Sequence, residues 1–491
     1  MWTKESLHDL VKSKLTDYHF IVVSNREPYI HTYAGSEIYC QVPASGVTTA
    51  LDPLMRVCGG TWIAHGSGDA DKKMVDNCDK VQVPPDEPKY TLKRLWLSKE
   101  EEEGFYFGFS NEAIWPLCHI SYTRPVFNEY DWNTYKKVNQ LFADAVVNEI
   151  GDEKAFVFIQ DYQLALLSKF IKERNPNIIT AQFWHIPWPN PEAFRICPWQ
   201  EEILDGLLGN NLLGFHTRYH CNNFLDTIDR SLEALVDREK YEITRSGKKT
   251  KVHPFPISID FEQISLEAQR DVVSTRVEGL KKRLGLNTHL VGIGLDRLDY
   301  TKGIPDRFKA IDRLLDKYPE YIGRVVFIQA GVPSRIHIEV YKRLNEEISS
   351  LVEKVNWKYS LGHWRPIVYL KGHVSPLTLI ALRQMADFCI VSSLHDGMNL
   401  VAKEFVASRF DEDGVLILSQ FAGAATELSD ALMINPYAID HFAETIRQAL
   451  KMPKKERQQR MKKMRGVVQE KNVYAWAADI TSELVKLGVG E

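Results

Sequence analysis

The sequence predicts an α/β protein made of two Rossmann-like domains, each with a parallel sheet. Short apolar runs recur along the chain and have the length of strands that are buried on both faces, as the strands of a parallel sheet are. Amphipathic stretches separate most of these runs, as right-handed β–α–β crossovers require. A length of 491 residues is sufficient for two or three domains.

The expected strands divide into two series. The first series comprises 20–23, 156–159, 181–186 and 212–216, and the second comprises 290–295, 324–330, 367–370, 388–391, 415–418 and 431–434. The clearest helices are expected at 302–317, 337–354, 375–387 and 399–409. The segment 251–260 contains two prolines and is the predicted linker. The expected domains are therefore 1–258 and 259–469, with a last helix in 470–491 that packs back on the first domain.

Composition excludes several classes of function. Hydrophobic residues make up 44% and charged residues 26%, and the net charge of −4 is too small to favour nucleic acid or an anionic membrane as partner. The seven cysteines are scattered without a C-x-x-C pair, which favours free thiols. No signal-peptide core and no apolar run near the ~18 residues of a membrane span is present, so a cytoplasmic protein is expected.

Chemically active side chains cluster where the expected strands end. In open α/β sheets, ligands bind beyond the carboxyl ends of the strands. The residues in such positions are Arg26, Asp161, His185, Asp296, Arg297, Arg335 and Asp396. Solubility alone does not explain this placement.

The strongest local signal is DRLDYTKG at 296–303. Arg297 and Lys302 stand between a strand and a helix expected to begin near Gly303. A helix N-terminus carries partial positive charge and free N–H groups, so these residues predict a diphosphate site. The alternative is a solvated loop with two ordinary cations.

The second signal is SLHDGMNLVAKEFVA at 393–407. Asp396 precedes Gly397, where the backbone can approach a ligand closely, and Glu404 follows about two helical turns later. A carboxylate so placed could bind paired sugar hydroxyls. The alternative is that Asp396 caps the helix and Glu404 lies on the surface.

The third signal is FWHIPWPNPE at 183–192, where His185 ends an apolar run and prolines stiffen the following loop. A lone histidine is more often a satisfied structural residue. Asp161, at the end of the preceding strand, makes His185 a candidate site residue.

Three further patterns are set aside. The G-x-G at 292–294 lies inside a strand and has Arg297 where a dinucleotide fingerprint needs its third glycine. The DAD at 69–71 lies in a polar loop and is a weak candidate for a metal-binding D-x-D, and FDEDG at 410–414 is expected to be a loop. Neither a metal nor another cofactor is therefore expected.

Taken together, the motifs identify a resemblance to the trehalose-6-phosphate synthase family, glycosyltransferase family 20. It runs from about residue 20 to about residue 450 and is carried by SNRE (24–27), FSNEAIWP (109–116), QDYQL (160–164), HIPWPNPE (185–192), LLGFHT (212–217), DRLDYTKG (296–303), PSR (333–335), DGMNLVAKE (396–404) and LSQFAGA (418–424). The resemblance implies a GT-B fold, with two Rossmann-like domains facing a central cleft. The first would bind the acceptor and the second the nucleotide sugar.

The resemblance also implies roles for individual residues. Asp161, His185, Arg297 and Lys302 would be catalytic. The donor would be bound by Gly46, Arg297, Lys302, Val374, Asp396, Gly397, Met398, Asn399, Leu400, Val401 and Glu404. The acceptor would be bound by Arg26, Trp62, Tyr106, Trp115, Asp161 and Arg335. Gly46 and Trp62 match an N-terminal loop that closes on the substrates.

The implied reaction is metal-independent, retaining transfer of glucose from a nucleotide-glucose, UDP-glucose first, to glucose 6-phosphate, giving α,α-trehalose 6-phosphate. The partners would be these two substrates, without nucleic acid or membrane; homo-oligomerisation is left open. Val374 stands where family members carry an aromatic residue, which leaves UDP, GDP and ADP open. Gln160 and Gln163 replace usual histidines, and the 31–46 loop is long. Alternatives are a synthase that uses glycerol 3-phosphate and a non-catalytic regulatory paralogue.

Overall fold

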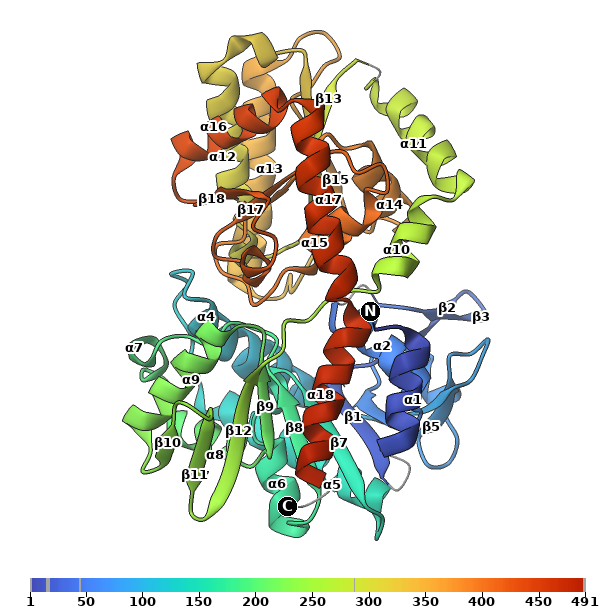
Figure 1. Cartoon of the computed structure of the whole chain (residues 1–491), viewed down its shortest axis with the longest axis vertical. Coiled ribbons are helices and arrows are strands. Elements are labelled where there is room, and N and C mark those ends of the chain that lie inside the picture. The colour runs from blue at the N-terminus through green and yellow to red at the C-terminus, as the bar shows by residue number, and fades with distance from the viewer. Residues whose placement is uncertain (1, 15–17, 44–45, 287, 489–491) are drawn as a thin grey trace. The chain divides into compact units, whose positions relative to one another are not determined.

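The computed structural model describes residues 2–14, 18–43, 46–286 and 288–488. The chain divides into two compact units. Unit 1 is Met1–Ile257 with Val473–Glu491, and unit 2 is Ser258–Asn472. Each unit contains one large sheet whose strands are mostly parallel, which confirms the predicted α/β class (Figure 1).

Unit 1 is built on a ten-stranded sheet with the order β10-β11-β12-β9-β8-β7-β1-β4-β6-β5. The strands from β12 to β6 in this order are parallel, and the outer strands β5, β10 and β11 pair antiparallel. Their bounds are β1 His19–Arg26, β4 Thr61–His65, β5 Lys80–Val83, β6 Tyr90–Leu95, β7 Ala155–Gln160, β8 Ile179–Phe183, β9 Leu212–Phe215, β10 Leu235–Asp237, β11 Glu242–Arg245 and β12 Lys248–Pro254.

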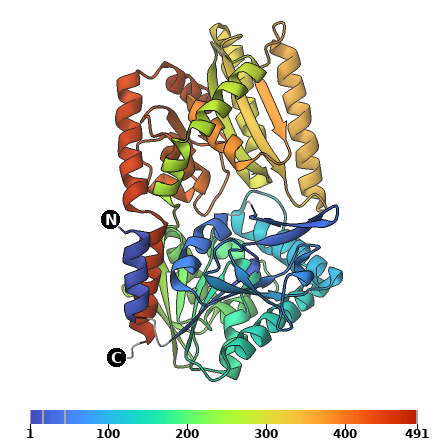
Figure 2. The same cartoon turned by 90° about the vertical axis from the view of Figure 1, so that its right-hand side faces the viewer.

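The helices of unit 1 surround this sheet. They are α1 Lys4–Lys14, α2 Gly46–Cys58, α3 Lys99–Glu102, α4 Trp115–His119, α5 Glu129–Ile150, α6 Leu167–Arg174, α7 Pro191–Phe194, α8 Gln200–Leu207, α9 Arg218–Ser231 and α18 Val473–Gly488, with the 3-10 turns η1 Asp71–Lys73 and η3 Tyr162–Leu164 and the π-helix η2 Glu103–Ile114. Helices α1 and α18 come from opposite ends of the chain and lie side by side (Figures 1 and 2). The C-terminal helix therefore packs within unit 1.

A separate hairpin follows β1. Strands β2 (Ile30–Ala34) and β3 (Glu37–Gln41) pair only with each other within the described chain, and every residue of β3 is exposed. The sequence predicted a loop here. A two-stranded hairpin is at best marginally stable in water, so its attachment to the rest of unit 1 matters.

Unit 2 has a six-stranded, fully parallel sheet with the order β15-β14-β13-β16-β17-β18. The strands are β13 Leu290–Leu298, β14 Val325–Pro333, β15 Ile367–Lys371, β16 Phe388–Val391, β17 Val415–Ser419 and β18 Leu432–Ile434. Every strand predicted for the second half is present. The long apolar runs were informative because both faces of this sheet are covered.

The helices of unit 2 complete its Rossmann-like pattern. They are α10 Phe261–Ala268, α11 Asp271–Leu284, α12 Ile304–Lys317, α13 Glu339–Tyr359, α14 Pro376–Met385, α15 Leu400–Ser408, α16 Ile439–Lys451 and α17 Lys454–Glu470, with the 3-10 turns η4 Tyr300–Lys302, η5 Pro319–Tyr321 and η6 Gly423–Thr426. One apolar core joins α12, α13 and α16 to the sheet through side chains such as Phe308, Ile348, Phe327 and Phe442. This packing fixes the ends of β13 and β16, from which the polar residues described below emerge.

The predicted linker 251–260 is partly wrong. Its first residues belong to β12, which pairs parallel with β9 and buries Val252 completely. Pro254 can occupy the last position of the strand because the missing N–H is at the end of the ladder. The division between the units comes only after Ile257.

Candidate functional site

Three predicted residues of unit 1 lie at one edge of its sheet. Arg26 is the last residue of β1, Asp161 directly follows β7, and His185 lies two residues beyond β8. These strands are neighbours in the order β8-β7-β1 and run parallel. Their carboxyl ends therefore bring the three residues to the same side, where α/β sheets bind ligands.

Asp161 and His185 are held together directly. The backbone N–H of His185 donates to Oδ1 of Asp161 at 3.1 Å, and the His185 ring Nε2 lies 2.9 Å from Oε1 of Gln160. Asp161 has a φ of 70°, a left-handed conformation that non-glycine residues rarely adopt. Strain of this kind persists where the surrounding structure imposes it, and such positions cluster at functional sites.

His185 is neutral in this setting. Burial lowers its pKa well below 6.5, and the nearby His216 ring lowers it further. His216 Nε2 also lies 2.9 Å from the backbone oxygen of His185 and fixes the loop. The contact between Nε2 and Gln160 fixes the orientation of the neutral ring. His185 can therefore orient polar groups but does not supply a positive charge near pH 7.

Arg26 lies against the π-helix η2. Its Nη2 donates to the hydroxyl of Tyr106 at 2.8 Å. The Tyr106 carbonyl accepts from Asn111 Nδ2 at 2.6 Å, and Asn111 Oδ1 in turn accepts from the Tyr162 hydroxyl at 2.8 Å. The Tyr162 ring lies 5.7 Å from the ring of Trp115. The predicted residues Arg26, Tyr106 and Trp115 thus belong to one connected set, and π-helical segments are frequent at functional sites.

In unit 2, Lys302 and Asp396 form an ion pair. Lys302 Nζ lies 2.5 Å from Oδ2 of Asp396, and both side chains are more than four-fifths buried. Ser393 Oγ and Asn399 Nδ2 each donate to the same carboxylate oxygen at 3.1 Å. Asp396 is therefore a preorganised carboxylate beside a fixed cation.

Asp396 does not cap the helix α15, so that alternative is wrong. Asn399 is the N-cap residue, and its side-chain oxygen accepts from the backbone N–H of Ala402 at 3.3 Å. Asn399 has a φ of 77°, which turns the backbone sharply between Gly397 and the helix. The Asp396 side chain is thereby left available for the cluster with Lys302.

Helix α12 begins directly after Gly303, where the sequence predicted a helix N-terminus. Arg297 is near the end of β13, Lys302 ends η4, and Pro305 lies in the first turn of α12. Gly303 has a φ of 60°, and a Cβ there would meet the backbone oxygen of Ser392 at 2.3 Å. Only glycine allows this close approach of η4 to the β16 end, which places Lys302 beside Asp396.

Arg335 is buried in unit 2 beside a second carboxylate. Its Nη1 donates to the Tyr341 hydroxyl at 2.5 Å and lies 3.3 Å from Oδ2 of Asp299. Burial raises the pKa of Asp299, but Arg335 and then Arg297 and Lys302 outweigh it, so the pKa is lowered overall. Helix α13 begins only at Glu339, so Arg335 precedes the helix and is not a surface cation on it.

Glu404 of α15 forms an ion pair with Arg383 of α14. Four-fifths or so of the Glu404 side chain is buried, against nine-tenths for Arg383. Glu404 is therefore not a plain surface residue. An arginine fixes the orientation of this carboxylate, which is what a residue that accepts hydrogen bonds from a ligand needs.

Comparison with known proteins assigns the chain to a family. The model of glycosyltransferase family 20 matches residues 18–486. The chain belongs to glycosyltransferase family 20. The UDP-forming alpha,alpha-trehalose-phosphate synthase of Schizosaccharomyces pombe is 33% identical over 501 residues, which cover 98% of this chain and 94% of that protein.

Solved structures resemble this family-20 chain along most of its length. An E. coli structure, described as trehalose-6-phosphate bound with UDP-2-fluoro glucose, is 31% identical with a TM-score of 0.85 and covers 95% of this chain and 99% of its own. The UDP-forming synthase of Burkholderia xenovorans in complex with glucose-6-phosphate is 28% identical with a TM-score of 0.85. The match covers 95% of this chain and 100% of that chain. These neighbours confirm the predicted GT-B fold.

Two predicted residues of the family-20 chain lie elsewhere than expected. Trp62 is inside β4 and fully buried, not in a loop, and its indole N–H donates to Ser24 Oγ at 2.8 Å. A side chain with no exposed surface cannot contact a ligand in this structure. Gly46 is exposed at the first position of α2, and Val374 is half-buried in the segment between β15 and α14.

The aspartates of the DAD segment at 69–71 bind other groups of unit 1. Asp69 Oδ1 accepts from the backbone N–H of Tyr33 at 2.9 Å, and Asp71 is buried beside Arg94. Within the described residues, no three His, Cys, Asp or Glu side chains are grouped to hold a metal. In the same part of the chain, no helix is long and apolar enough to cross a membrane.

Sequence reasoning missed Arg307 in α12. This fully buried side chain donates to Asp296 Oδ2 at 2.6 Å, to Gln329 Oε1 at 2.7 Å and to Ser392 Oγ at 3.0 Å. It joins the ends of three strands behind Lys302. A signal was available, because position 307 falls on the same helical face as the apolar positions 304, 308 and 311.

Proposed function

We propose that the chain transfers a glucosyl group from UDP-glucose to glucose 6-phosphate with retention, giving α,α-trehalose 6-phosphate. The observation that carries this proposal is the Lys302–Asp396 pair beside the start of α12. It combines a cation for a leaving diphosphate with a carboxylate for sugar hydroxyls. The relatives named above support UDP as the nucleotide and glucose 6-phosphate as the acceptor.

Unit 2 would bind the donor. Arg297, Lys302 and the free N–H groups at the α12 N-terminus would hold the diphosphate, since a helix start favours an anion. Asp396 would accept hydrogen bonds from the transferred glucose, aided by the backbone N–H groups of Gly397, Met398 and Asn399. Glu404, oriented by Arg383, would accept from the ribose hydroxyls.

The rest of the donor site would surround the nucleoside. Leu400 and Val401 are the first residues of α15, next to the N-cap residue Asn399. Val374 would contact the nucleobase. Gly46, at the start of α2 in unit 1, is the remaining residue predicted for the donor. Val374 offers no aromatic ring for stacking, so base recognition there would depend on backbone groups and shape.

Unit 1 would bind the acceptor. Arg26 would hold the phosphate, with the Tyr106 hydroxyl and Trp115 beside it. Arg335, a residue of unit 2, is the remaining residue predicted to bind the acceptor. Asp161 would accept a hydrogen bond from a sugar hydroxyl of the acceptor. His185, neutral and fixed by Gln160, would contact the donor sugar near the reacting centre.

The chemistry follows from charge. As the glycosidic bond to the diphosphate breaks, negative charge grows on the leaving oxygen and the sugar gains oxocarbenium character. Lys302 is held by Asp396 before the reaction, so it would stabilise this charge together with Arg297 and with little reorganisation. The leaving phosphate oxygen can take the proton of the incoming hydroxyl on the same face, which retains configuration.

The proposal is tested by a matrix of substrates. UDP-, GDP- and ADP-glucose are each incubated with glucose 6-phosphate and with glycerol 3-phosphate, and products are identified by mass. Formation of a disaccharide phosphate from UDP-glucose and glucose 6-phosphate supports the proposal. If only glycerol 3-phosphate gives a product, glucose 6-phosphate is not the acceptor. If no pair of substrates gives a product, the proposed glycosyltransferase activity is wrong.

A further inference from the structure

A buried ionic cluster lies directly behind Arg26. Its centre is Arg94 of β6, whose side chain is fully buried between two carboxylates that are also fully buried. Arg94 Nε lies 2.8 Å from Glu27 Oε2, and Arg94 Nη2 lies 2.8 Å from Asp71 Oδ1. Ion pairs without solvent are costly to form, so a cluster of this kind needs further hydrogen bonds to be stable.

Those hydrogen bonds come from backbone groups of several segments. Glu27 Oε1 accepts from the N–H of Ser67 at 2.8 Å, and Asp71 Oδ2 accepts from the N–H of Gly68 at 2.6 Å. Asp71 Oδ1 accepts from the N–H of His31 at 2.8 Å, where the β2–β3 hairpin begins. Arg94 Nη2 also donates to the carbonyl of Tyr29 at 2.9 Å. The cluster therefore attaches both the end of β1 and the hairpin to the sheet.

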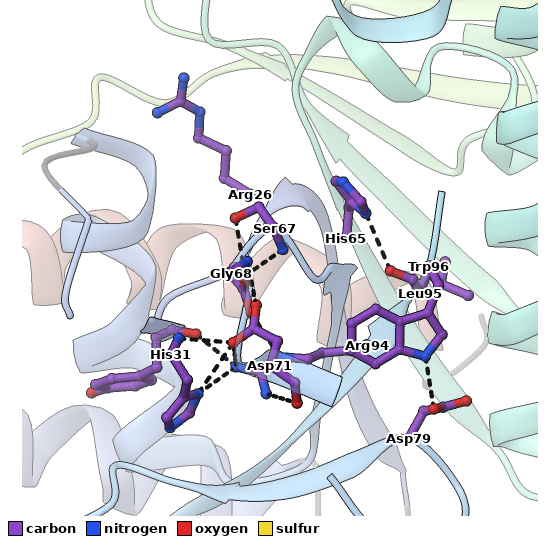
Figure 3. Close-up of polar contacts among 12 residues, drawn as sticks. Arg26, His31, His65, Ser67, Gly68, Asp71, Asp79, Arg94, Leu95 and Trp96 are labelled. Carbon is purple, nitrogen blue, oxygen red and sulfur yellow. Dashed lines mark hydrogen bonds and ion pairs between the residues drawn. The ribbon is translucent and has the colours of Figure 1, made fainter. Parts of the chain in front are cut away.

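Arg26 itself is excluded from this cluster. Figure 3 shows its side chain pointing away from Asp71 and Arg94, whereas the next residue, Glu27, is bound to them. Arg26 and Glu27 are consecutive residues where β1 ends, and side chains of consecutive residues in an extended chain point to opposite sides. The direction of the Arg26 side chain thus depends on how its backbone is held.

The backbone of Arg26 is held on both sides. On one side, Ser24 Oγ donates to the Arg26 carbonyl at 2.6 Å and accepts from the Trp62 indole N–H at 2.8 Å. On the other side, Glu27 is anchored by Arg94 and Ser67. The buried Trp62, which cannot contact a ligand directly, therefore contributes to the placement of Arg26 through Ser24.

We propose that Glu27, Arg94 and Asp71 form a positioning network that presents Arg26 to the acceptor phosphate. The inference rests on the proposed function of Arg26. The three residues touch no substrate; they fix the peptide from which the phosphate-binding guanidinium extends. Removing one of them should weaken acceptor binding while leaving the donor site in unit 2 and the chemical step unchanged.

The charges support this role. Two carboxylates share one guanidinium, and the titratable side chains of His31 and Cys40 also lie near these charges. Burial, and then the hydrogen bond with Asp71, raise the pKa of Glu27 to about 7. A carboxylate kept in so unfavourable a setting costs stability, which is expected where a network specifies geometry.

The test compares Glu27→Gln with Glu149→Gln. Glu149 is a matched control because its side chain is also a buried carboxylate of unit 1, paired at 2.9 Å with Lys80 and with Lys93 of β6. Within the described residues, no hydrogen bond or ion pair joins it directly to Arg26, Glu27 or Arg94. Steady-state kinetics would give kcat and the KM of both substrates, and thermal unfolding would report stability. Glu27→Gln should raise the KM for glucose 6-phosphate by about fivefold or more, with kcat and the KM for UDP-glucose within about twofold of wild type.

Glu149→Gln should lower the melting temperature without changing either KM. If the two variants have the same KM for glucose 6-phosphate, the positioning role is wrong. Ser24→Ala is a milder second variant, which should also raise this KM alone; an unchanged value would likewise overturn the inference. A wild-type chain that forms no product from the two substrates overturns the proposed function as well, so the two failures are distinguishable.

Discussion

The ammonium of Lys302 lies 2.5 Å from Oδ2 of Asp396, although 94 positions separate the two residues in the chain. The pair joins the start of α12 to the segment after β16. Neither charge is exposed enough to be kept for solubility, because their side chains are only 13% and 14% accessible. A fixed cation and a fixed carboxylate are thus available together in unit 2.

Lys302→Met should lower turnover by roughly 10²–10³, the usual loss when one preorganised charge contact to the transition state is removed. Lys309→Met is the control, because Lys309 lies in the next helix, α12, and is exposed beside Asp306. Steady-state rates with UDP-glucose and glucose 6-phosphate measure both. Near-normal turnover of Lys302→Met would remove Lys302 from the diphosphate site.

Arg335→Ala should raise the KM for glucose 6-phosphate by about ten- to a hundredfold, because a hydrogen bond to a charged group contributes roughly 1.5–3 kcal/mol. It should also destabilise the protein, since the buried Asp299 loses its partner. Tyr341→Phe is the control for this second effect. It removes the hydroxyl that contacts both Arg335 and Asp299 but keeps the guanidinium.

Kinetics and thermal unfolding of these two variants separate the roles of Arg335. We expect Tyr341→Phe to lower the melting temperature and leave the KM unchanged. If Arg335→Ala lowers the melting temperature but leaves the KM for glucose 6-phosphate at the wild-type value, then Arg335 is only structural.

A strong chelator should leave activity unchanged, because Arg297 and Lys302 would neutralise the leaving diphosphate. Rates are compared before and after dialysis against EDTA, with UDP-glucose and glucose 6-phosphate as substrates. Loss of activity that Mn²⁺ or Mg²⁺ restores would contradict the fixed-cation account.

Glu27 should make stability fall as the pH rises. Its pKa is about 7 in the folded protein against an ordinary value of 4.5, so the folded chain keeps a proton that the unfolded chain has lost. Between pH of about 4.5 and 7 the free energy of unfolding should therefore decrease, by at most about 3 kcal/mol from this group. Asp71 makes stability rise with pH, because its pKa is lowered to about 2 in the folded protein. This effect lies at more acidic pH than that of Glu27.

Urea unfolding at pH 5 and pH 7.5 tests this prediction with Glu27→Gln as reference, since glutamine does not titrate. The stability of wild type relative to the variant should be greater at pH 5 than at pH 7.5. If the free energies of unfolding of wild type and Glu27→Gln differ by the same amount at pH 5 and pH 7.5, then Glu27 is ionised in the folded protein at both pH values.

All six strands of the unit 2 sheet, and β1, β7, β8 and β9 of unit 1, could be predicted because they appear as continuous apolar runs. Strand β6 could not, because its residues alternate between buried and half-exposed and include Lys93 and Arg94. The hairpin was missed for a related reason: β3 is exposed at every position and carries no periodic apolar signal.

The candidate site shows the same limit. Arg297, Lys302 and Asp396 could be selected because each follows a predicted strand. The partners of Arg335 could not, because the sequence shows neither that Asp299 is buried nor that Tyr341 turns toward it. Trp62 was assigned to a loop because its strand, β4, is only five residues long and had not been predicted.

The central claim is that glucose 6-phosphate is the acceptor for glucose from UDP-glucose. The most direct measurement is the mass and anomeric configuration of the product when UDP-glucose is supplied with equal amounts of glucose 6-phosphate and glycerol 3-phosphate. The account predicts α,α-trehalose 6-phosphate as the main product, with release of UDP. A glucosylglycerol phosphate as the main product, or release of free glucose without a disaccharide phosphate, would contradict it.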